Sequence, residues 1–446
     1  MAQYVHTTGD IIAPNQLKLI DGYVNNYLFS LIKGLRQNNF GYNTLHTVSQ
    51  EISEYRKTLG TNRKFFIDSG GYSIIAGQVS PRDTSKFIEC YNTFLEKDAI
   101  DNCDYIFSLD IPIFLKYPEN NTIKTIYDSN AKSISESVKI LKKNPELYKK
   151  FIFVWQFKLL KQYNIWKQIY NENLENDSNL QNFAIGGLVS LRGITGIKFS
   201  PFIALSYKIL KILYDKNMDL TSILHILGVY HLHDRVIMPF LHKLFNNYYL
   251  KDRNCKIQFT YDTVNYALSG LYKLKEQLML IPIENSSGSS YISGSSYISG
   301  YAHDLIDKMH IVIPDESVLD VVKHDLNCVL AGKNVENTTV TSLLNVITQT
   351  TIDKIINEEL DRNNIVELFV TCENFNKFKN QITPILLNLE HKYPLIFGNR
   401  TKKNLLNFQY CFAFHQWWLN GRNEQELEKL IEKFISLINF PFDLKD

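Results

Sequence analysis

Three acidic residues stand directly after apolar runs of the kind that form buried strands. Asp68 follows Phe65-Phe66-Ile67 and precedes Ser69-Gly70-Gly71, and Asp110 and Asp262 end two further runs. A buried carboxylate is costly unless it is paired or takes part in chemistry. A single acid of this kind is usually a turn residue that caps a helix. Its recurrence favours a site for proton transfer or nucleophilic attack.

An amide and several glycines occupy comparable positions on other apolar runs. Gln156 lies near the end of one run, Gly186 and Gly187 interrupt a second run before Leu188, and Gly228 lies in a third. Glycine lets the backbone approach a flat ligand closely, although the glycine pair could instead serve strand packing alone. With the three acids, these groups predict a pocket for a planar heterocycle.

Apolar runs alternate with amphipathic helical segments, which predicts an α/β protein with a parallel sheet. At least six strand–helix units fit within about 200 residues, which suits a (β/α)8 TIM barrel. An open doubly wound sheet is the alternative, but no Gly-x-Gly-x-x-Gly follows the first clear strand, which ends at Asp68. In a barrel, the C-terminal strand ends meet in one pocket, so we expect the acids, Gln156 and the glycines to converge there.

The sequence predicts three parts. Residues 1–275 would form the barrel core, in which 16–35 has apolar residues at helical spacing. Residues 276–403 would be an insertion, mixed but mainly helical, and 404–446 a closing helical segment that packs back on the barrel. The insertion contains a Ser/Gly-rich duplication over 288–299. A flexible loop is the simpler interpretation of the duplication, and a tyrosine-bearing flap that stacks on bases is the alternative.

The composition is that of an ordinary globular protein. The 446 residues include 48 basic and 46 acidic side chains, a net charge of +2. This balance gives no global attraction to nucleic acid, so any polyanion site must be a local patch. No apolar run approaches the length of about 20 residues that spans a bilayer, and the N-terminus has no secretory pattern. We therefore expect a cytoplasmic protein with no membrane partner.

Cysteine and histidine give weak signals for metal binding. No two cysteines are close enough in the sequence for a Cys-x-x-Cys knuckle, which fits a reducing compartment. The six are Cys90, Cys103, Cys255, Cys328, Cys372 and Cys411. His231 and His233 could bind metal or phosphate, but a solvated loop is the simpler interpretation.

These motifs follow the order found in the tRNA-guanine transglycosylase superfamily, which residues 65–268 resemble. Members of this superfamily exchange a guanine in nucleic acid for a 7-deazaguanine on a (β/α)8 barrel. The matching elements are Asp68-Ser69-Gly70-Gly71, Asp110, Gln156, Ile185-Gly186-Gly187-Leu188, Leu227-Gly228-Val229 and Tyr261-Asp262-Thr263-Val264-Asn265-Tyr266-Ala267-Leu268. Residues 404–421 weakly resemble the closing helix of the family.

The resemblance implies a pentosyltransferase. Asp262 would attack the sugar carbon C1′, and Asp68 would transfer protons as the general acid/base. The substrate base would contact side-chain and main-chain groups from several strand ends. These are Ser69, Gly70, Asp110, Gln156, Gly186, Gly187, Leu188 and Gly228. Ser69 could equally cap a helix. The implied chemistry needs no metal and no other cofactor.

Several departures from the family pattern point to its DNA-modifying branch. The Cys-x-Cys-x-x-Cys and His zinc site of the family is missing, and Tyr72-Ser73 stands where the tRNA enzymes have Phe-Gln. These positions help to hold tRNA. The chain is therefore most similar to phage and bacterial enzymes that insert 7-deazaguanines into DNA. The expected partners are DNA and a free base such as preQ0, in the cytoplasm of a bacterial host if the protein is phage-encoded. Activity on tRNA, or a non-catalytic nucleic-acid-binding barrel, is the alternative.

Overall fold

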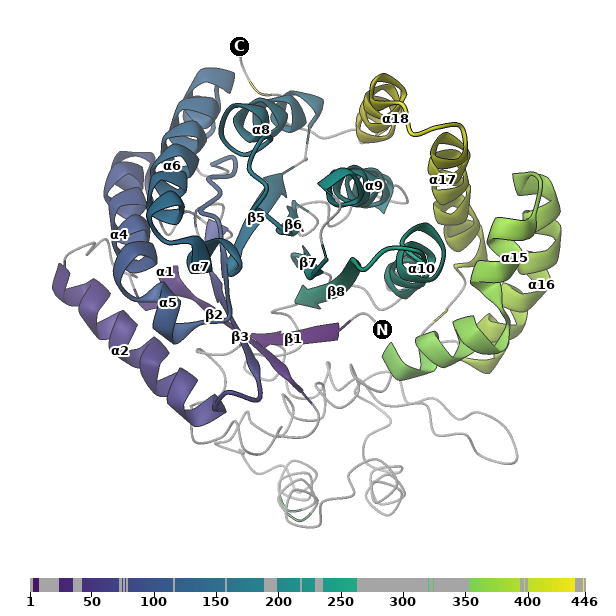
Figure 1. Ribbon diagram of the computed structural model, residues 1–446, viewed down its shortest axis with the longest axis horizontal. Helices are drawn as coiled ribbons and strands as arrows, with labels where there is room; N and C mark the ends of the chain where they lie inside the picture. Colours follow the sequence, from purple (N-terminus) through teal and green to yellow (C-terminus); the bar gives the residue numbers. More distant parts are fainter. Residues whose placement is uncertain are drawn as a thin grey trace.

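The computed structural model describes residues 3–7, 24–34, 42–71, 79–114, 117–156, 159–187, 199–216, 219–228, 236–262, 353–393 and 400–437, with single residues between these ranges. The described residues include eight strands in the middle of the molecule, with helices on several sides of them (Figure 1). The strands are β1 (Gln3–Thr7), β2 (Asn26–Ser30), β3 (Lys64–Asp68), β4 (Tyr105–Phe107), β5 (Phe151–Gln156), β6 (Asn182–Gly186), β7 (Thr221–Ile226) and β8 (Lys256–Asp262).

The strands pair in chain order and every pair is parallel. The first strand also pairs with the last, with Val5 opposite Asp262, a pairing that an open doubly wound sheet does not have. The α/β class and the parallel sheet that curls on itself are therefore confirmed. Most of the connection between β1 and β2 lies outside the described residues, so the complete strand–helix repeat is not described.

From β2 to β8, helices lie between successive strands and cover the outside of the sheet (Figure 1). Around the sheet these are α1 (Leu31–Gly34), α2 (Tyr42–Leu59), α4 (Thr84–Lys97), α5 (Ala99–Asn102), α6 (Ile123–Lys143), α7 (Pro145–Tyr148), α8 (Leu160–Asn173), α9 (Phe199–Lys216) and α10 (Ile237–Leu244). The longest of them, α6, begins where the Thr122 hydroxyl accepts a hydrogen bond of 3.0 Å from the Thr125 amide. Such a cap satisfies one of the backbone donors left free at a helix start.

Alternate residues of the strands face the interior of the barrel. These side chains form a separate buried apolar cluster of Val5, Leu28, Phe66, Phe107, Ile152, Val154, Ala184 and Ile223. Side chains two residues apart on a strand share a face. Asp68 follows Phe66 by two residues and Gln156 follows Val154 by two, so both polar groups cap this apolar interior. The period of the strands thus positions the predicted site residues.

The structure corrects two expectations about local structure. Residues 26–30, predicted as part of a helix over 16–35, form β2. All five pair with β3, from Asn26 opposite Lys64 to Ser30 opposite Asp68, so sheet pairing outweighs the local helical spacing. Gly228, predicted inside a strand, lies in a turn just beyond the end of β7.

A second layer of helices covers one side of the barrel. Helical residues 353–362 lead into α15 (Ile365–Thr371), α16 (Phe375–Lys392), α17 (Thr401–Leu419) and α18 (Glu424–Ser436). Both α17 and α18 pack against α9, while α15 packs against α10 (Figure 1). The predicted domain limit at 275/276 and the duplication over 288–299 lie outside the described residues. The limit at 403/404 falls in the first turn of α17.

Glu428 on α18 joins this layer to the barrel helices. Its carboxylate accepts hydrogen bonds from the Tyr163 hydroxyl at 3.0 Å and from the ammonium groups of Lys167 at 2.6 Å and Lys208 at 2.7 Å. Lys208 is buried, with only 8% of its surface exposed. A buried ion pair is tolerated when both partners are hydrogen-bonded, so this cluster fixes the position of α18.

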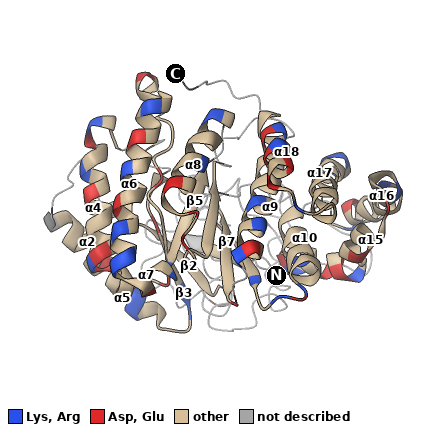
Figure 2. Ribbon diagram, turned by 45° about the horizontal axis from the view of Figure 1, so that its top comes forward, with Lys and Arg blue, Asp and Glu red and all other residues tan. Residues whose placement is uncertain are grey.

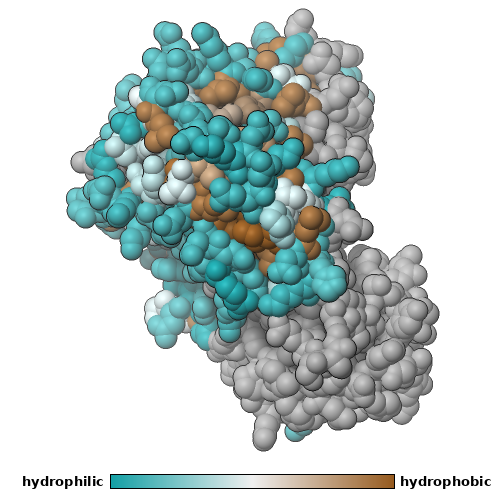
Figure 3. Space-filling model, turned by 90° about the vertical axis from the view of Figure 1, so that its right-hand side faces the viewer, coloured by the Kyte–Doolittle hydropathy of each residue, from teal (hydrophilic) through white to brown (hydrophobic). Residues whose placement is uncertain are grey.

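Basic and acidic side chains alternate along the outer helices, whereas the strands carry few of them (Figure 2). The side of the molecule on which α15 and α16 lie is mainly hydrophilic, with apolar residues grouped between the polar ones (Figure 3). Among the described helices, none combines the length and the apolar character that crossing a bilayer requires.

Candidate active site

The three acids predicted from the sequence come together at the C-terminal ends of the strands. Asp68 and Asp262 are the last residues of β3 and β8, and Asp110 lies in the loop that follows β4. Asp110 and Asp262 both act on Asp68 through their charges. In parallel barrels, functional groups gather at this end of the sheet. The expected convergence of these acids is therefore present in the described residues.

Asp110 is held on both of its oxygens. The Ser69 hydroxyl donates to Oδ1 at 3.3 Å, and the Gln156 amide donates from Nε2 to Oδ2. Asp110, Ser69 and Gln156 are all buried. The Gln156 carbonyl oxygen, Oε1, has no hydrogen-bond partner among the described residues. A buried acceptor without a partner is costly, so this oxygen is available to a donor on a bound molecule.

Helix α6 fixes the loop that carries Asp110. The Asn130 side chain accepts a hydrogen bond from the Ile111 amide at 2.7 Å and donates one to the Ile111 carbonyl at 2.9 Å. The Ser133 hydroxyl donates to the Leu109 carbonyl at 3.3 Å. Asn130 and Ser133 are completely buried. The loop on either side of Asp110 is therefore tied to a rigid helix, which holds the carboxylate in one place.

Two glycines leave room for this arrangement. A Cβ atom on Gly186 would lie 2.4 Å from Nε2 of Gln156, and one on Gly71 would lie 2.9 Å from Oδ2 of Asp110. Contacts this short do not occur in folded proteins, so any side chain at either position would displace the polar group beside it. Gly186 was expected to let the backbone approach a ligand closely, and in the structure it makes room for the side chain of Gln156.

Asp68 is a half-buried carboxyl group with an altered acidity. Burial, then the charge of Asp110, and more weakly that of Asp262, raise the pKa of Asp68 to about 7, against hydrogen bonds from Gly70 and Ser30 that lower it. Ser30 ends β2 directly opposite Asp68 in the sheet register. A pKa near the pH of the cell suits a group that both gives and takes a proton.

Asp262 is anchored through one oxygen. Its Oδ1 accepts a hydrogen bond from the Gly228 amide at 3.0 Å and lies 3.1 Å from Nε2 of His225. The positive φ of Gly228, 71°, turns the backbone so that its amide faces the carboxylate. Gly187 also has a positive φ, 99°.

Sequence analysis missed His225 and Thr260, whose side chains are 2.9 Å apart below Asp262. Both are polar residues inside otherwise apolar strands, and that interruption is the signal that could have identified them. Some predicted residues lie outside the described residues, and their roles stay predictions. These are Leu188, His231, His233 and residues 263–268.

The described residues hold no group of three or more metal-binding side chains. Five cysteines, Cys90, Cys103, Cys255, Cys372 and Cys411, are free thiols. In chemical terms, the site combines an anchored carboxylate, a carboxyl group that titrates near neutrality and a hydrogen-bonding pair, Asp110 and Gln156. That set can perform nucleophilic displacement with proton transfer on a planar, hydrogen-bonding substrate.

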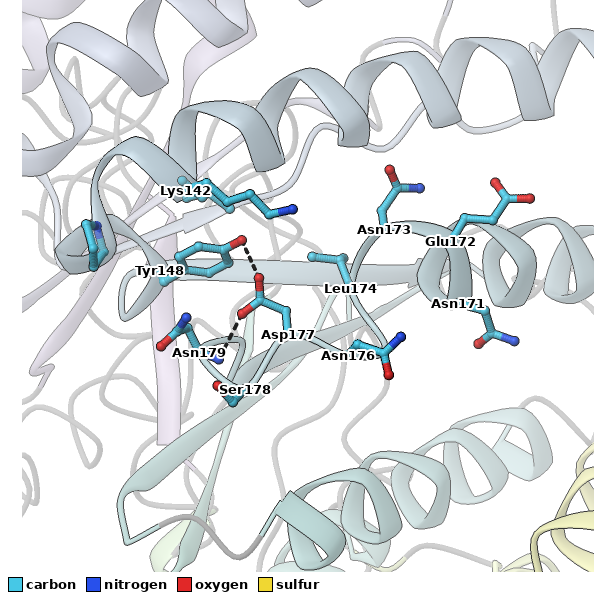
Figure 4. Close-up of a pocket in the computed structure, with 12 residues that line it drawn as sticks. Lys142, Tyr148, Asn171, Glu172, Asn173, Leu174, Asn176, Asp177, Ser178 and Asn179 are labelled. Atoms are coloured by element: carbon cyan, nitrogen blue, oxygen red, sulfur yellow. Dashed lines mark hydrogen bonds between the residues drawn. The ribbon is translucent and has the colours of Figure 1, made fainter.

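A hollow of about 450 Å³ lies away from these residues, and Figure 4 shows the side chains that line it. Residues near the ends of α6, α7 and α8 and the segment 174–179 line it, and Tyr148 donates a hydrogen bond to Asp177 across it. These helix ends precede the N-termini of the next strands, and this face of a barrel serves stability. None of the predicted site residues lines this hollow.

Comparison with known proteins finds no family model and no curated protein that matches this chain. The resemblance to the transglycosylase superfamily therefore rests on the ordered motifs alone. The geometry of Asp68, Asp110, Gln156 and Asp262 is independent of that resemblance.

Proposed function

We propose that the chain forms a complete (β/α)8 TIM barrel and is a transglycosylase that replaces guanine in DNA with a 7-deazaguanine base such as preQ0. The observation that carries the proposal is the juxtaposition of two carboxyl groups with different surroundings. Asp262 is anchored by hydrogen bonds to one oxygen, while Asp68 is close enough for the charge of Asp262 to raise its pKa. Two acids made unequal by their environment suit one nucleophile and one proton carrier.

In the first step, the target nucleotide is rotated out of the base stack and enters the barrel mouth. Oδ2 of Asp262 attacks C1′ as the bond from C1′ to N9 of guanine breaks. The electron pair of that bond goes to the departing guanine, which takes the proton of Asp68. The products are free guanine and a covalent ester between Asp262 and the sugar.

In the second step, the incoming base replaces guanine in the same pocket. Its N9–H proton passes to the Asp68 carboxylate, N9 attacks C1′, and the bond from C1′ to Oδ2 breaks to restore the Asp262 carboxylate. Asp68 thus ends the cycle protonated, as it began. A pKa of about 7 favours this use in both directions, because neither form is strongly preferred at neutral pH.

Asp110 and Gln156 are suited to selecting the base. The Asp110 carboxylate can accept hydrogen bonds from the N–H groups on the pyrimidine edge of guanine or a 7-deazaguanine. The amide of Gln156 already donates to Asp110, so its orientation is fixed and its Oε1 can accept a further bond. A site built to bond donors rejects bases that lack them, because its buried acceptors would stay unpaired.

DNA is preferred to tRNA as the polymer because the sequence departs from the family at the positions that hold tRNA. A non-catalytic barrel is disfavoured because it would gain nothing from keeping costly buried acids. We place the activity in the cytoplasm, which would be that of a bacterial host for a phage-encoded protein.

The proposal is tested by incubating the protein with labelled preQ0 and, separately, duplex DNA, single-stranded DNA or unmodified tRNA. Mass spectrometry of the digested nucleosides then shows which polymer has gained label. We expect label in DNA and a loss of at least about 10³-fold for Asp262→Asn. Label in tRNA alone would support the alternative substrate. Label in neither polymer, with folded protein, would remove base exchange with preQ0 as the function.

A further inference from the structure

His225 lies in the barrel interior between two residues of the neighbouring strand. Its Nδ1 is 2.9 Å from the Thr260 hydroxyl, and its Nε2 is 3.1 Å from Oδ1 of Asp262. Thr260 is the direct partner of His225 in the register of β7 and β8. Asp262 follows Thr260 by two residues, and so lies on the same face of the strand. One imidazole ring therefore bridges two polar groups on the same face of β8.

The partners of the ring define which nitrogen carries the proton. An ionised carboxylate can only accept hydrogen bonds, so the contact with Asp262 places a proton on Nε2 of His225. In the neutral ring the other nitrogen is an acceptor, and the Thr260 hydroxyl can donate to it. Asp262 thus selects the tautomer whose Nε2–H group faces it, and the Thr260 hydroxyl holds the other ring nitrogen.

The surroundings of the ring are apolar and closed. The side chain of His225 has no exposed surface, and the rings of Phe107 and Phe66 lie 4.7 Å and 5.9 Å from it, centroid to centroid. A hydrogen bond to a charged group is stronger in such an environment than in water. The ring cannot turn without leaving a buried nitrogen unpaired, which is costly.

The contact with His225 makes the two carboxylate oxygens of Asp262 unequal. Its Oδ1 accepts two hydrogen bonds, from His225 and from the Gly228 amide. Among the described residues, none donates to Oδ2. Only 9% of the Asp262 side chain is exposed, so the carboxylate has little freedom to rotate. The lone pairs of Oδ2 can therefore react with a substrate, while Oδ1 is fixed by its two hydrogen bonds.

We infer that His225 is a positioning residue that, with Thr260, orients Asp262 so that Oδ2 faces the substrate sugar. The inference rests on the proposed function, since it assigns His225 to the nucleophilic step. His225 touches neither base nor sugar in this scheme. It lowers the barrier by holding the nucleophile in the reactive orientation.

The test compares His225→Leu, which removes the ring nitrogens, with His225→Gln, whose amide can donate from the position of Nε2. In single-turnover base exchange on DNA, we expect His225→Leu to slow formation of the covalent intermediate by about 10- to 100-fold, as for other groups that orient a reacting residue. The affinity for preQ0 should change by less than about threefold. His225→Gln should recover most of the rate. His415→Leu, at a buried histidine on α17, controls for simple loss of packing.

A second measurement does not depend on activity. With 15N-labelled histidine, the His225 signals are identified by their absence in His225→Gln, and their shifts show which ring nitrogen carries the proton. We expect protonated Nε2 in the wild type, because the Asp262 carboxylate can only accept a hydrogen bond.

The kinetic and the NMR measurements distinguish failure of the positioning role of His225 from failure of the proposed base exchange. If the wild type transfers label and His225→Leu does so at the same rate, or if only Nδ1 is protonated, the positioning role is wrong and base exchange stands. If His225→Gln is as slow as His225→Leu, the role of the Nε2–H group is likewise refuted. If the ring is protonated at Nε2 but no polymer gains label from the wild type, base exchange fails and the hydrogen bond to Asp262 stands.

Discussion

The side-chain amide of Gln156, at the end of β5, donates a hydrogen bond to the carboxylate of Asp110, in the loop after β4. This bond joins two neighbouring strand ends and fixes the direction of both polar groups. It also leaves Oε1 of Gln156 without a hydrogen-bond partner among the described residues. Four tests of the site and its support follow from such contacts.

Asp110→Asn should weaken base recognition more than it weakens folding. The new amide offers a donor where the base also presents donors, and Gln156 loses a charged acceptor. We expect kcat/KM for the free base to fall about 10- to 100-fold, which corresponds to roughly 1.4–2.7 kcal/mol. Steady-state kinetics with varied preQ0 measures this. Asp215→Asn, at an exposed acid on α9, is the matched control. An unchanged kcat/KM would exclude Asp110 from base recognition.

The acidity of Asp68 should appear in the pH dependence of stability. Its pKa is raised from 3.8 to about 7, so between these values the folded state holds a proton that the unfolded state has lost. The free energy of unfolding contributed by this group therefore decreases as pH rises from about 4 to about 7. Urea titrations at several pH values should show this decrease in the wild type and its loss in Asp68→Asn. Parallel curves for the two proteins would contradict the raised pKa.

Gly186→Ala should disrupt the site through Gln156. The added methyl would lie 2.4 Å from Nε2 of Gln156, so the amide must move and its bond to Asp110 must break. We expect a loss of stability of about 1–3 kcal/mol and a larger loss of base exchange than stability alone explains. Gly60→Ala is the control, because nothing lies within 4 Å of its added Cβ. Its only cost is the positive φ of 67°. Equal activity in the two variants would argue against this steric role.

Glu428→Gln should destabilise the protein without changing the chemistry. The substitution removes the more buried of the two carboxylates that contact the Lys208 ammonium, so that only the more exposed Glu424 remains as its charge partner. Removing one member of a buried pair costs about 3–5 kcal/mol. Chemical denaturation measures the change, with the exposed acid of the same helix in Glu432→Gln as the control. Normal stability of Glu428→Gln would show that α18 is held by apolar packing alone.

Much of the candidate site can be predicted from the sequence, because the end of a buried strand is marked by a polar residue after an apolar run. Asp68, Asp110, Gln156 and Asp262 each follow an apolar run, and parallel strands bring such ends together. The sequence did not reveal β2, because five residues carry too little pattern to compete with a helical spacing over a longer window. The local spacing of apolar residues does not predict which distant strands pair with one another.

The supporting contacts of the site were beyond sequence reasoning for the same reason. His225 meets Asp262 only because β7 and β8 lie in register, and Asn130 meets Ile111 only because α6 folds over the loop after β4. Neither pair is recognisable from spacing along the chain. The proposed nucleophile, Asp262, can be predicted from the apolar run that precedes it. The residues that orient it can be identified only from the register of β7 and β8.

The pairing of β1 with β8 has a consequence for how the protein is made. Val5 lies opposite Asp262. Strand β8, which carries the proposed nucleophile Asp262, therefore pairs on one side with β7 and on the other with β1, which is far away in the sequence. Contacts between such distant residues form late in folding because loop closure must precede them. Until β8 leaves the ribosome, β1 and the growing sheet present open edges, which are prone to pair with other chains. The synthesis of β8 therefore both brings Asp262 to the candidate site and pairs the edges that would favour aggregation.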